Sequence, residues 1–558
     1  MGNIFEKTLP TPNYRQMEWY SRGYTAFIHF GMNTFTDREW GDGTESPSTF
    51  NPSELDCRQW IRVLKEAGFG SAILTAKHHD GFCLWPSKYT EHSVKNSPFR
   101  GGNGDVVREF TDACREYGMK AGLYLSPWDR HEKTWGSDEY NDYYVNQLTE
   151  LLSNYGKIHE IWWDGAGSTQ AVYDWDRWHA TVRTLQPDAV IFGSLGAAPY
   201  VDIRWVGNEK GYAGRPCWAT SDIDTLVTEI RDDLNSGNIN GEKFVPAEVD
   251  VSIRPGWFYH SNQDGDVRTP ENLIYLWSSS IGRNSGLLLN LPPDRRGLIH
   301  ERDVESVLKF KENIEKNLSI NHAANAIASA SSIYSDEYSP SNVLNDDRES
   351  FYAPTEHDVE PELTLKLDGK KRFNTAMLKE VLEYGHRIIE FEFYAKIDGE
   401  WKLLFANQCM GYKCVEHFEE VETDEVMLKI KKSRGVPLVN GISLYSFEGH
   451  IEPKRAAKVG FELMTNASVT YPENENSIDI NFGGVYPFNT LSFELDGEAS
   501  VEMLVFNGTR FEKFDDLALK SNTVCTLKQT VDYAYRIKLN VSGTPAESVK
   551  LSVKYEEK

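Results

Sequence analysis

The sequence predicts an α/β domain with a (β/α)8-like barrel, followed by two antiparallel β-sandwich domains. Its 558 residues exceed what one hydrophobic core normally supports. From Tyr24 onward, short apolar runs alternate with segments of helical period, as parallel β/α units do. Helical periodicity fades near Leu318, and short alternating segments follow. We therefore expect domains at residues 1–320, 321–450 and 451–558.

Eight apolar runs in the first domain are predicted strands, and eight is the number that closes such a barrel. They are Tyr24–Gly31, Ser71–His79, Lys120–Ser126, Ile158–Asp164, Ala189–Ser194, Ile203–Gly207, Val245–Ile253 and Gly286–Leu291. The predicted helices between and after them are Asp56–Ala67, Asp105–Tyr117, Asp138–Tyr155, Val172–Leu185, Pro270–Ile281 and Glu301–Lys316. The connection before Ile203 is short for a helical crossover.

Polar and aromatic residues gather where the predicted strands end. In a barrel of this class, functional groups sit at the carboxyl ends of the strands. Six ends carry such groups: residues 29–31, 77–82, 124–128, 162–165, 207–209 and 252–257. Ordinary packing easily explains one polar or aromatic residue at a strand end. It does not explain why six strand ends are all enriched in such residues. We therefore predict a functional site at this end of the barrel.

The segment Glu160–Gly167 is the strongest single candidate within this site. An apolar run ends there in a carboxylate, and small residues follow at once. Because side chains alternate along a strand, Trp162 and Asp164 share one face. An aromatic ring beside a carboxylate suits a sugar, whose C–H face stacks on aromatics. In the alternative interpretation, Asp164 only caps the following helix.

Together, these motifs closely resemble the α-L-fucosidases of glycoside hydrolase family 29, in particular the subgroup that acts on branched α-1,3/1,4-linked fucose. The resemblance covers about the first 320 residues. It rests on His-Phe-Gly at 29–31, Lys-His-His-Asp-Gly-Phe at 77–82, Trp-Trp-Asp-Gly at 162–165, Gly-Asn-Glu at 207–209 and Ser-Ile-Arg-Pro-Gly-Trp at 252–257. It implies a retaining, exo-acting hydrolase without a cofactor, with fucosylated oligosaccharides or glycoconjugates of Lewis type as substrates.

The resemblance also implies the catalytic roles: Asp164 attacks the anomeric carbon, and Glu209 protonates the departing oxygen. Retention requires two carboxyl groups roughly 5 Å apart, one ionised and one protonated. We expect Trp205 and Tyr212 to provide the apolar surroundings that keep Glu209 protonated. Other carboxyl groups near strand ends or loops compete for the acid role: Glu39, Glu45, Asp80, Asp129 and Glu248.

By the same resemblance, a further set of residues binds the fucose ring. It comprises His29, His78 and His79 as hydroxyl partners, Tyr124 and Trp162 as pocket lining, and Arg254 and Trp257 as the closing wall. Adjacent His78 and His79 both reach the sugar only if their strand twists or ends there. Trp40 and Trp85 are expected as additional walls, although ordinary loop packing explains them equally well. A branching galactose would contact the loops Asp37–Phe50 and Lys210–Trp218.

The composition argues against nucleic acids and membranes as partners. A net charge of -25 repels phosphate backbones, so no nucleic acid partner is expected. No run of about 18 apolar residues is present, which argues against membrane insertion. As it stands, the sequence lacks a signal-peptide pattern and predicts a cytoplasmic protein, or a periplasmic or secreted one if such a peptide has been removed. Seven scattered cysteines predict no disulfide framework, although Cys409 and Cys414 could pair.

The region after the barrel predicts two sandwiches. Its first part alternates in segments such as Leu363–Leu367 and Ile389–Tyr394. Residues 330–354 resemble the opening of a discoidin or coagulation-factor type C module, a type that commonly binds galactose-type sugars. The last part, Glu452–Lys558, also alternates but carries no motif that we connect to chemistry. A spacer, a second sugar-binding module and a dimer contact all remain open there.

Two other functions remain as alternatives. One is a metal-dependent barrel hydrolase, but the first half has no His-x-His motif and no closely spaced cysteine pair, so no metal is expected. Adjacent histidines also make a poor chelating pair on one strand face. The other is a carbohydrate-binding protein without catalysis, which the presence of both Asp164 and Glu209 disfavours.

Overall fold

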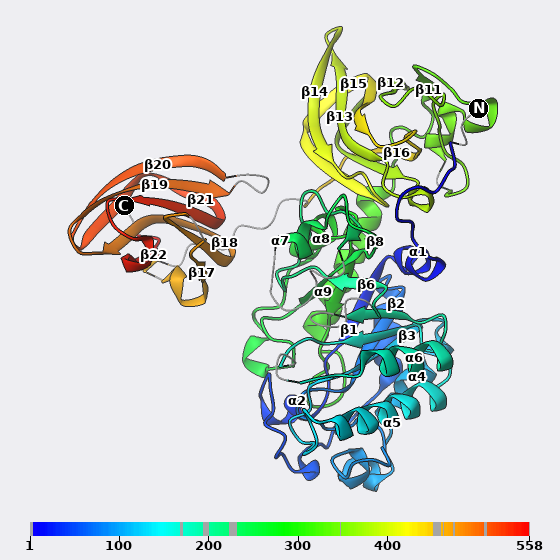
Figure 1. The fold of residues 1–558 in the computed structure, drawn as a ribbon, viewed down its shortest axis with the longest axis vertical. Helices are drawn as coiled ribbons and strands as arrows, with labels where there is room; N and C mark the ends of the chain where they lie inside the picture. Colours follow the sequence, from blue (N-terminus) through cyan, green and yellow to red (C-terminus); the bar gives the residue numbers. More distant parts are fainter. Residues whose placement is uncertain are drawn as a thin grey trace. The chain divides into compact units, whose positions relative to one another are not determined.

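The protein consists of two compact units, Met1–His450 and Ile451–Lys558. A computed structural model describes residues 4–167, 171–193, 200–222, 232–345, 347–449, 459–460, 462–472, 475–506 and 511–556. The first unit holds a closed barrel and the sheet that follows it, and the second holds a further antiparallel sheet (Figure 1).

Eight parallel strands close the barrel in the order β1-β10-β9-β6-β5-β4-β3-β2. They are β1 Tyr24–Ile28, β2 Ser71–Lys77, β3 Lys120–Leu125, β4 Glu160–Trp163, β5 Val190–Gly193, β6 Ile203–Trp205, β9 Ala247–Ser252 and β10 Gly286–Asn290. The predicted barrel is confirmed, and each strand corresponds to a predicted one. All eight stop slightly before the predicted end, so the polar end motifs lie mostly on loops.

Helices surround the barrel. They are α1 Tyr14–Ser21, α2 Met32–Thr36, α3 Cys57–Glu66, α4 Val106–Glu116, α5 Asp138–Asn154, α6 Trp175–Leu185, α7 Asp232–Ser236, α8 Pro270–Ser279 and α9 Glu301–Leu318. The short helices α1, α2 and α7 were not predicted. The side chains of Asp56, Asp105 and Asp174 accept backbone N–H groups at the starts of α3, α4 and α6, which fixes where these helices begin.

A charged layer fills the barrel interior toward the amino-terminal ends of the strands. Arg22 Nη1 lies 2.7 Å from Glu160 Oε2, and both side chains are almost fully buried. Glu248 accepts a hydrogen bond from Trp162 Nε1 at 3.0 Å and another from Trp19 Nε1 at 3.3 Å. These contacts provide partners for buried polar groups and hold the Trp162 indole in one orientation.

Both β-rich regions form six-stranded antiparallel sheets. The first contains β11 Ile327–Ala330, β12 Glu362–Glu380, β13 Ile388–Ile397, β14 Glu400–Gln408, β15 Cys414–Ser433 and β16 Val439–Tyr445. The second contains β17 Ser468–Thr470, β18 Ser477–Glu494, β19 Glu498–Phe506, β20 Phe511–Lys520, β21 Thr523–Ser542 and β22 Lys550–Lys554. A separate pair, β7 Thr220–Ser221 with β8 Lys243–Phe244, lies beside the barrel. The predicted change from α/β to all-β architecture after the barrel is thus confirmed.

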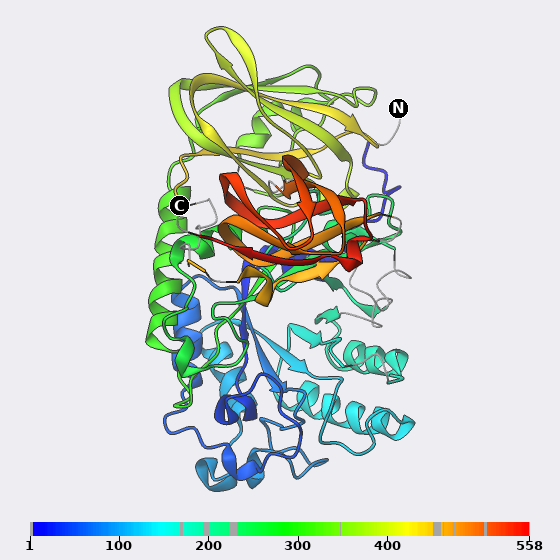
Figure 2. The same cartoon turned by 90° about the vertical axis from the view of Figure 1, so that its left-hand side faces the viewer.

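The domain of β11–β16 packs against the amino-terminal end of the barrel (Figures 1 and 2). Tyr20, just before β1, stacks on Tyr412 with ring centroids 4.5 Å apart. Ser278, near the last residue of α8, lies 3.0 Å from His417. Because the helices run opposite to the strands, both contacts mark the end of the barrel remote from the strands' carboxyl ends.

The first described residues of the chain pack on this same sheet domain before the chain enters the barrel. Arg387 donates hydrogen bonds to the carbonyl oxygens of Ile4, at 2.6 Å, and Glu6, at 3.0 Å. The Phe5 ring packs on Tyr338, with centroids 5.1 Å apart. Within the first unit, the amino-terminal segment therefore packs on the β11–β16 sheet before it continues into the barrel.

These contacts predict that the barrel is unstable alone. We expect a chain ending at residue 320 to unfold roughly 10 °C or more below the full chain, because each kcal/mol lost shifts the midpoint by about 2–4 °C. Apolar surface around Tyr20 would become exposed. Thermal unfolding measures this, with a chain ending at residue 449 as control. An unchanged midpoint for the shorter chain would contradict the prediction.

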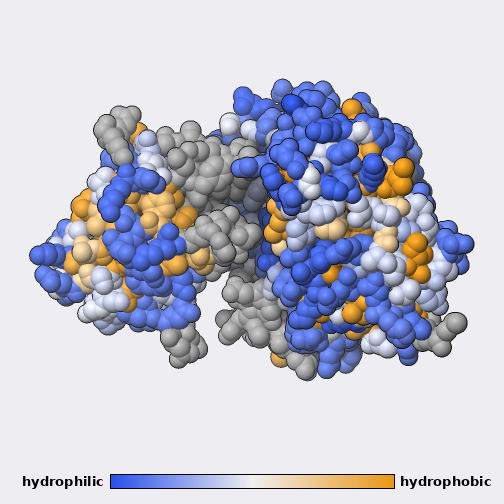
Figure 3. All heavy atoms as spheres, turned by 90° about the horizontal axis from the view of Figure 1, so that it is seen from above, coloured by the Kyte–Doolittle hydropathy of each residue, from blue (hydrophilic) through white to orange (hydrophobic). Residues whose placement is uncertain are grey.

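The seven cysteines are all free thiols, so the pairing of Cys409 with Cys414 is wrong. Cys409 Sγ instead donates to the carbonyl oxygen of Cys217 at 3.0 Å. No helix in the described part of the chain is long and apolar enough to cross a membrane. In the view of Figure 3, hydrophilic side chains dominate the surface and apolar residues are scattered among them, as the large excess of acidic residues leads one to expect.

Candidate active site

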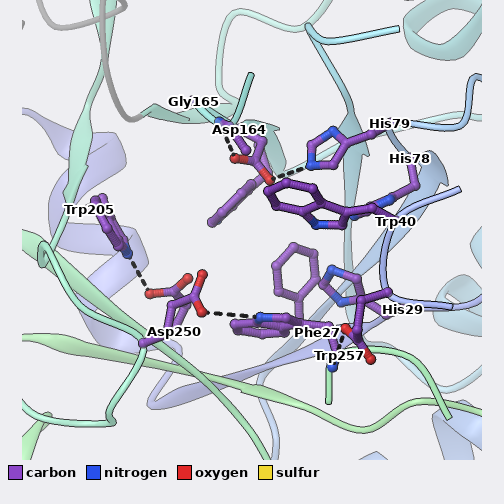
Figure 4. Close-up of a pocket in the computed structure, with 14 residues that line it drawn as sticks. Phe27, His29, Trp40, His78, His79, Asp164, Gly165, Trp205, Asp250 and Trp257 are labelled. Atoms are coloured by element: carbon purple, nitrogen blue, oxygen red, sulfur yellow. Dashed lines mark hydrogen bonds and ion pairs between the residues drawn. The ribbon is translucent and has the colours of Figure 1, made fainter. Parts of the chain in front are cut away.

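A cavity of about 240 Å³ lies at the carboxyl ends of the barrel strands (Figure 4). Aromatic rings, histidines and four carboxyl groups surround it. Its lining comprises Phe27, His29, Glu39, Trp40, His78, His79, Trp162, Asp164, Gly165, Ala166, Trp205, Glu209, Asp250 and Trp257. The end motifs of five different strands thus meet in one pocket, as predicted from the barrel topology.

Asp164 follows β4 directly and is held by three groups. Its Oδ1 accepts the backbone N–H of Ala166 at 2.8 Å, and its Oδ2 accepts the hydroxyl of Tyr124 at 3.0 Å. His79 Nε2 lies 3.7 Å from the same Oδ2. These contacts fix the direction of the Asp164 carboxyl group. Because Asp174 caps α6 instead, the interpretation of Asp164 as a helix cap is wrong.

Glu209 lies on the loop after β6, and its surroundings change the pKa of its carboxyl group. Burial raises its pKa, the hydrogen bond from Trp257 lowers it, and the negative charges of Asp164 and Glu39 raise it further. The net effect is a pKa above the ordinary value. Trp257 Nε1 lies 3.3 Å from Glu209 Oε2 and supplies a donor without adding positive charge. The pocket therefore combines one carboxyl group held by hydrogen-bond donors with a second whose pKa is raised.

Asp250 is a third pocket carboxyl group, which the sequence interpretation missed. It lies on β9 and is only 4% exposed, and Trp205 Nε1 donates to its Oδ1 at 2.7 Å. Burial raises the pKa of Asp250 well above the ordinary range, and the charge of Glu209 adds to this. The available signal was the alternation Glu248-Asp250-Ser252 within an apolar strand, which places polar side chains inside the barrel.

The other competitors for the acid role differ in position. Glu39 lines the cavity, whereas Glu248 does not. The Glu248 carboxyl group instead accepts hydrogen bonds from the indoles of Trp19 and Trp162. Asp129 pairs with Lys77, Asp80 accepts the backbone N–H of Phe82, and Glu45 accepts that of Asp42. After Glu209, the next candidate acid is therefore Asp250 rather than Glu248.

Three histidines line the cavity as neutral rings. Burial lowers the pKa of His29 to about 3, although its hydrogen bond with Asn290 opposes this. Burial also lowers the pKa of His78 well below its ordinary value and that of His79 to a smaller extent. Because β2 ends at Lys77, the alternation of a regular strand does not apply to His78 and His79, and both reach the pocket.

Some of the predicted aromatic wall residues line the cavity, and others do not. Trp40 lines the cavity with 54% of its surface exposed. Trp162 lines it from strand β4, and Trp257 lines it from the loop after β9. Trp85 follows the alternative of ordinary loop packing: it is 2% exposed, and its Nε1 donates to Glu150 at 2.8 Å. The Trp85 side chain therefore packs into the hydrophobic core beneath its loop. Trp205 lines the pocket as expected for a neighbour of Glu209, whereas Tyr212 does not belong to the lining.

Arg254 does not close the pocket, so its predicted position is wrong. Its side chain is fully buried and forms ion pairs with Asp303 at 2.9 Å and Asp264 at 2.8 Å. A buried guanidinium needs such partners, and the acidic residues of neighbouring segments supply them. Arg254 thus anchors the loop that carries Trp257. In the described residues, no group of three or more His, Cys, Asp or Glu is arranged to hold a metal ion.

Comparison with known proteins decides the family. A family model described as alpha-L-fucosidase matches residues 8–318, which contain the whole barrel. The chain belongs to the α-L-fucosidase family, glycoside hydrolase family 29. The enzyme is 42% identical over 451 residues to Alpha-L-fucosidase 1 of Arabidopsis thaliana, across 78% of this chain and 88% of the relative.

Solved structures agree with this assignment. A putative α-L-fucosidase from Bacteroides thetaiotaomicron is 43% identical with a TM-score of 0.77, covering 79% of this chain and 99% of that one. A Ruminococcus gnavus GH29 fucosidase in complex with fucose is 30% identical with a TM-score of 0.74, covering 79% and 96%. A putative α-L-fucosidase from Bacteroides ovatus is 33% identical with a TM-score of 0.69 and covers 99% and 98%. The present enzyme is accordingly a glycoside hydrolase that acts on α-L-fucosides.

Proposed function

We propose that the enzyme retains the anomeric configuration, with Asp164 as nucleophile and Glu209 as general acid and base. Asp164 attacks the anomeric carbon while Glu209 gives its proton to the departing glycosidic oxygen. Glu209 then removes a proton from water, which displaces Asp164 from the sugar. The observation that carries this proposal is the single cavity that holds a carboxylate bound by donors and a second carboxyl group with a raised pKa.

The remaining lining fits one fucose ring. Neutral His29, His78 and His79 can each donate a hydrogen bond to a sugar hydroxyl group or accept one from it. Tyr124, which was expected to line the pocket, is fully buried outside the lining and donates its hydroxyl to Asp164. Phe27, Trp162 and Trp257 line the apolar part, which suits the C6 methyl group and the C–H face of the sugar. The lining supports removal of a terminal fucose.

Stereochemistry tests the mechanism directly. We expect proton NMR at early times to show α-L-fucose as the first product from an aryl α-L-fucoside, before mutarotation. A retaining enzyme forms this anomer because two successive displacements occur at the same carbon. If β-L-fucose forms first, water attacks directly, and the role of Asp164 as nucleophile is wrong.

We also propose that branched α-1,3/1,4-linked fucose is preferred over linear α-1,2-linked fucose. The exposed indole of Trp40 on the loop Asp37–Phe50 supports this, because it offers a stacking surface beyond the fucose ring. We expect kcat/KM to be at least about tenfold higher on a Lewis trisaccharide than on an H-type sugar. A Trp40→Ala variant should lose most of this ratio. Comparable kcat/KM values for the wild type would contradict the preference.

For the domain of β11–β16 we propose binding to galactose-type sugars. Its antiparallel architecture and the resemblance of residues 330–354 to discoidin-like modules support this. Since the domain contacts the barrel end remote from the cavity, its sugar site would be separate from the catalytic one. Calorimetry with galactose on the full chain carrying Asp164→Gly tests this, with excess fucose present to saturate the pocket. Absence of heat would contradict it.

A further inference from the structure

His260, on the loop after β9, is placed between two carboxylates. Its Nδ1 lies 2.8 Å from Asp37 Oδ1, and its Nε2 lies 2.7 Å from Glu39 Oε1. An ionised carboxylate only accepts hydrogen bonds, so both ring nitrogens must carry a proton to satisfy both contacts. The geometry therefore describes an imidazolium ion that joins the loop after β1 to the loop after β9.

Glu39 extends this connection to the pocket wall. Its Oε2 accepts the backbone N–H of Trp257 at 2.9 Å, and its Oε1 accepts that of Phe258 at 3.4 Å. Both Glu39 and Trp257 line the cavity, whereas His260 does not. A methyl group added at Gly256 would lie 2.3 Å from Glu39 Oε1, so the Glu39 carboxylate lies close to the backbone just before Trp257. The position of the Trp257 backbone thus depends on where Glu39 is held.

We propose that His260 is a positioning residue that holds Glu39 and Trp257 in the places that the bound sugar requires. We call the set Asp37, Glu39 and His260 the carboxylate–histidine clasp. The clasp has no contact with Asp164, and it reaches Glu209 only through the charge of Glu39 and the indole of Trp257. We therefore expect its main effect on sugar binding. This inference rests on the proposed function of the pocket as the fucose site.

Because His260 is protonated in the clasp, the stability of the clasp depends on pH. Partial burial lowers the pKa of His260, but the hydrogen bonds and charges of Asp37 and Glu39 together raise it above the ordinary value. A group with a raised folded-state pKa contributes its full stability below the unfolded value of about 6.5. The contribution is lost as the pH rises through the folded-state pKa. The neutral imidazole keeps one N–H group, so His260 then donates to Asp37 or to Glu39 but not to both.

Amide hydrogen exchange tests the clasp without any substrate. In the wild type, we expect the N–H groups of Trp257 and Phe258 to lose protection as the pH rises above about 6.5, after correction for intrinsic rates. His260→Leu should leave them unprotected throughout, and His260→Gln, which keeps one donor, should be intermediate. His357→Leu, at a histidine with 91% side-chain exposure in the β11–β16 domain, is the matched control. Equal protection in the wild type and in His260→Leu would overturn the proposal.

Kinetics provides the second test. We expect His260→Leu to raise KM for an aryl fucoside roughly 10²-fold, with kcat changed less than about threefold, since small displacements of positioning groups have effects of this size. His260→Gln should recover part of the loss. A fall in kcat at constant KM would overturn the positioning role. If the wild type cleaves no fucoside, the proposed function fails, while amide exchange still tests the clasp.

Discussion

Asp164→Gly is expected to reduce kcat by on the order of 10⁵-fold, while fucose continues to bind. Removing a covalent nucleophile eliminates the first displacement, and losses of this order accompany such changes in other hydrolases. The histidines and indoles that line the pocket remain, so affinity for fucose should change little. Turnover of an aryl fucoside measures the first effect, and calorimetry with fucose measures the second.

Added azide provides a sharper version of this experiment. The glycine variant leaves space where the carboxylate was, and azide entering there should attack the anomeric carbon from the same side. The expected product is β-L-fucosyl azide, with inverted configuration. Asp188→Gly, at an exposed carboxylate outside the cavity, is the control and should keep wild-type turnover. Near wild-type activity in Asp164→Gly would end the assignment.

Glu209→Gln is expected to slow hydrolysis of a Lewis trisaccharide by about 10²- to 10⁴-fold, and hydrolysis of an activated aryl fucoside far less. The sugar alcohol leaves poorly without a proton, whereas an acidic phenol does not need one. Because the pKa of Glu209 is raised, the acid is active below that pKa and its contribution is lost as the pH rises through it. The variant should therefore lack the basic limb in its pH profile of kcat.

Asp250→Asn is the informative companion variant. It keeps an acceptor for Trp205 and removes the neighbouring ionisable group. If Glu209→Gln slows both substrates equally and Asp250→Asn shows the leaving-group dependence, the acid is Asp250. The His260 clasp is expected to act mainly on KM, so the leaving-group dependence of kcat separates its effect from that of the acid.

The barrel could be predicted from the sequence because each β/α unit repeats the same apolar pattern, and because Asp side chains mark three helix starts. Asp164 was equally visible, since an apolar run ends in a carboxylate followed by glycine. The ends of the strands were less visible. Residues such as His78 continue the apolar and aromatic pattern beyond the last ladder hydrogen bond, and only the ladder defines where β2 stops.

The positions that the sequence interpretation misplaced, missed or left open have a common physical origin. Arg254 and Trp85 carry functional groups near strand ends, yet their partners Asp303 and Glu150 come from distant helices and turn the side chains away from the pocket. Asp250 was missed for the converse reason, because it lies inside a strand whose inward face becomes part of the cavity. Local patterns indicate which residues can act, whereas distant partners determine which of them face the substrate.

The packing of the amino-terminal segment on the β11–β16 domain has a consequence for synthesis. Arg387, which holds the carbonyl oxygen of Ile4, is made 383 residues later. At a translation rate of about 5–20 residues per second, the segment waits roughly 20–80 s for its partner. The barrel can close within that time, but the first unit cannot complete its fold from the amino terminus onward. Its earliest residues take their final position among the last, after the ribosome has released the sheet that receives them.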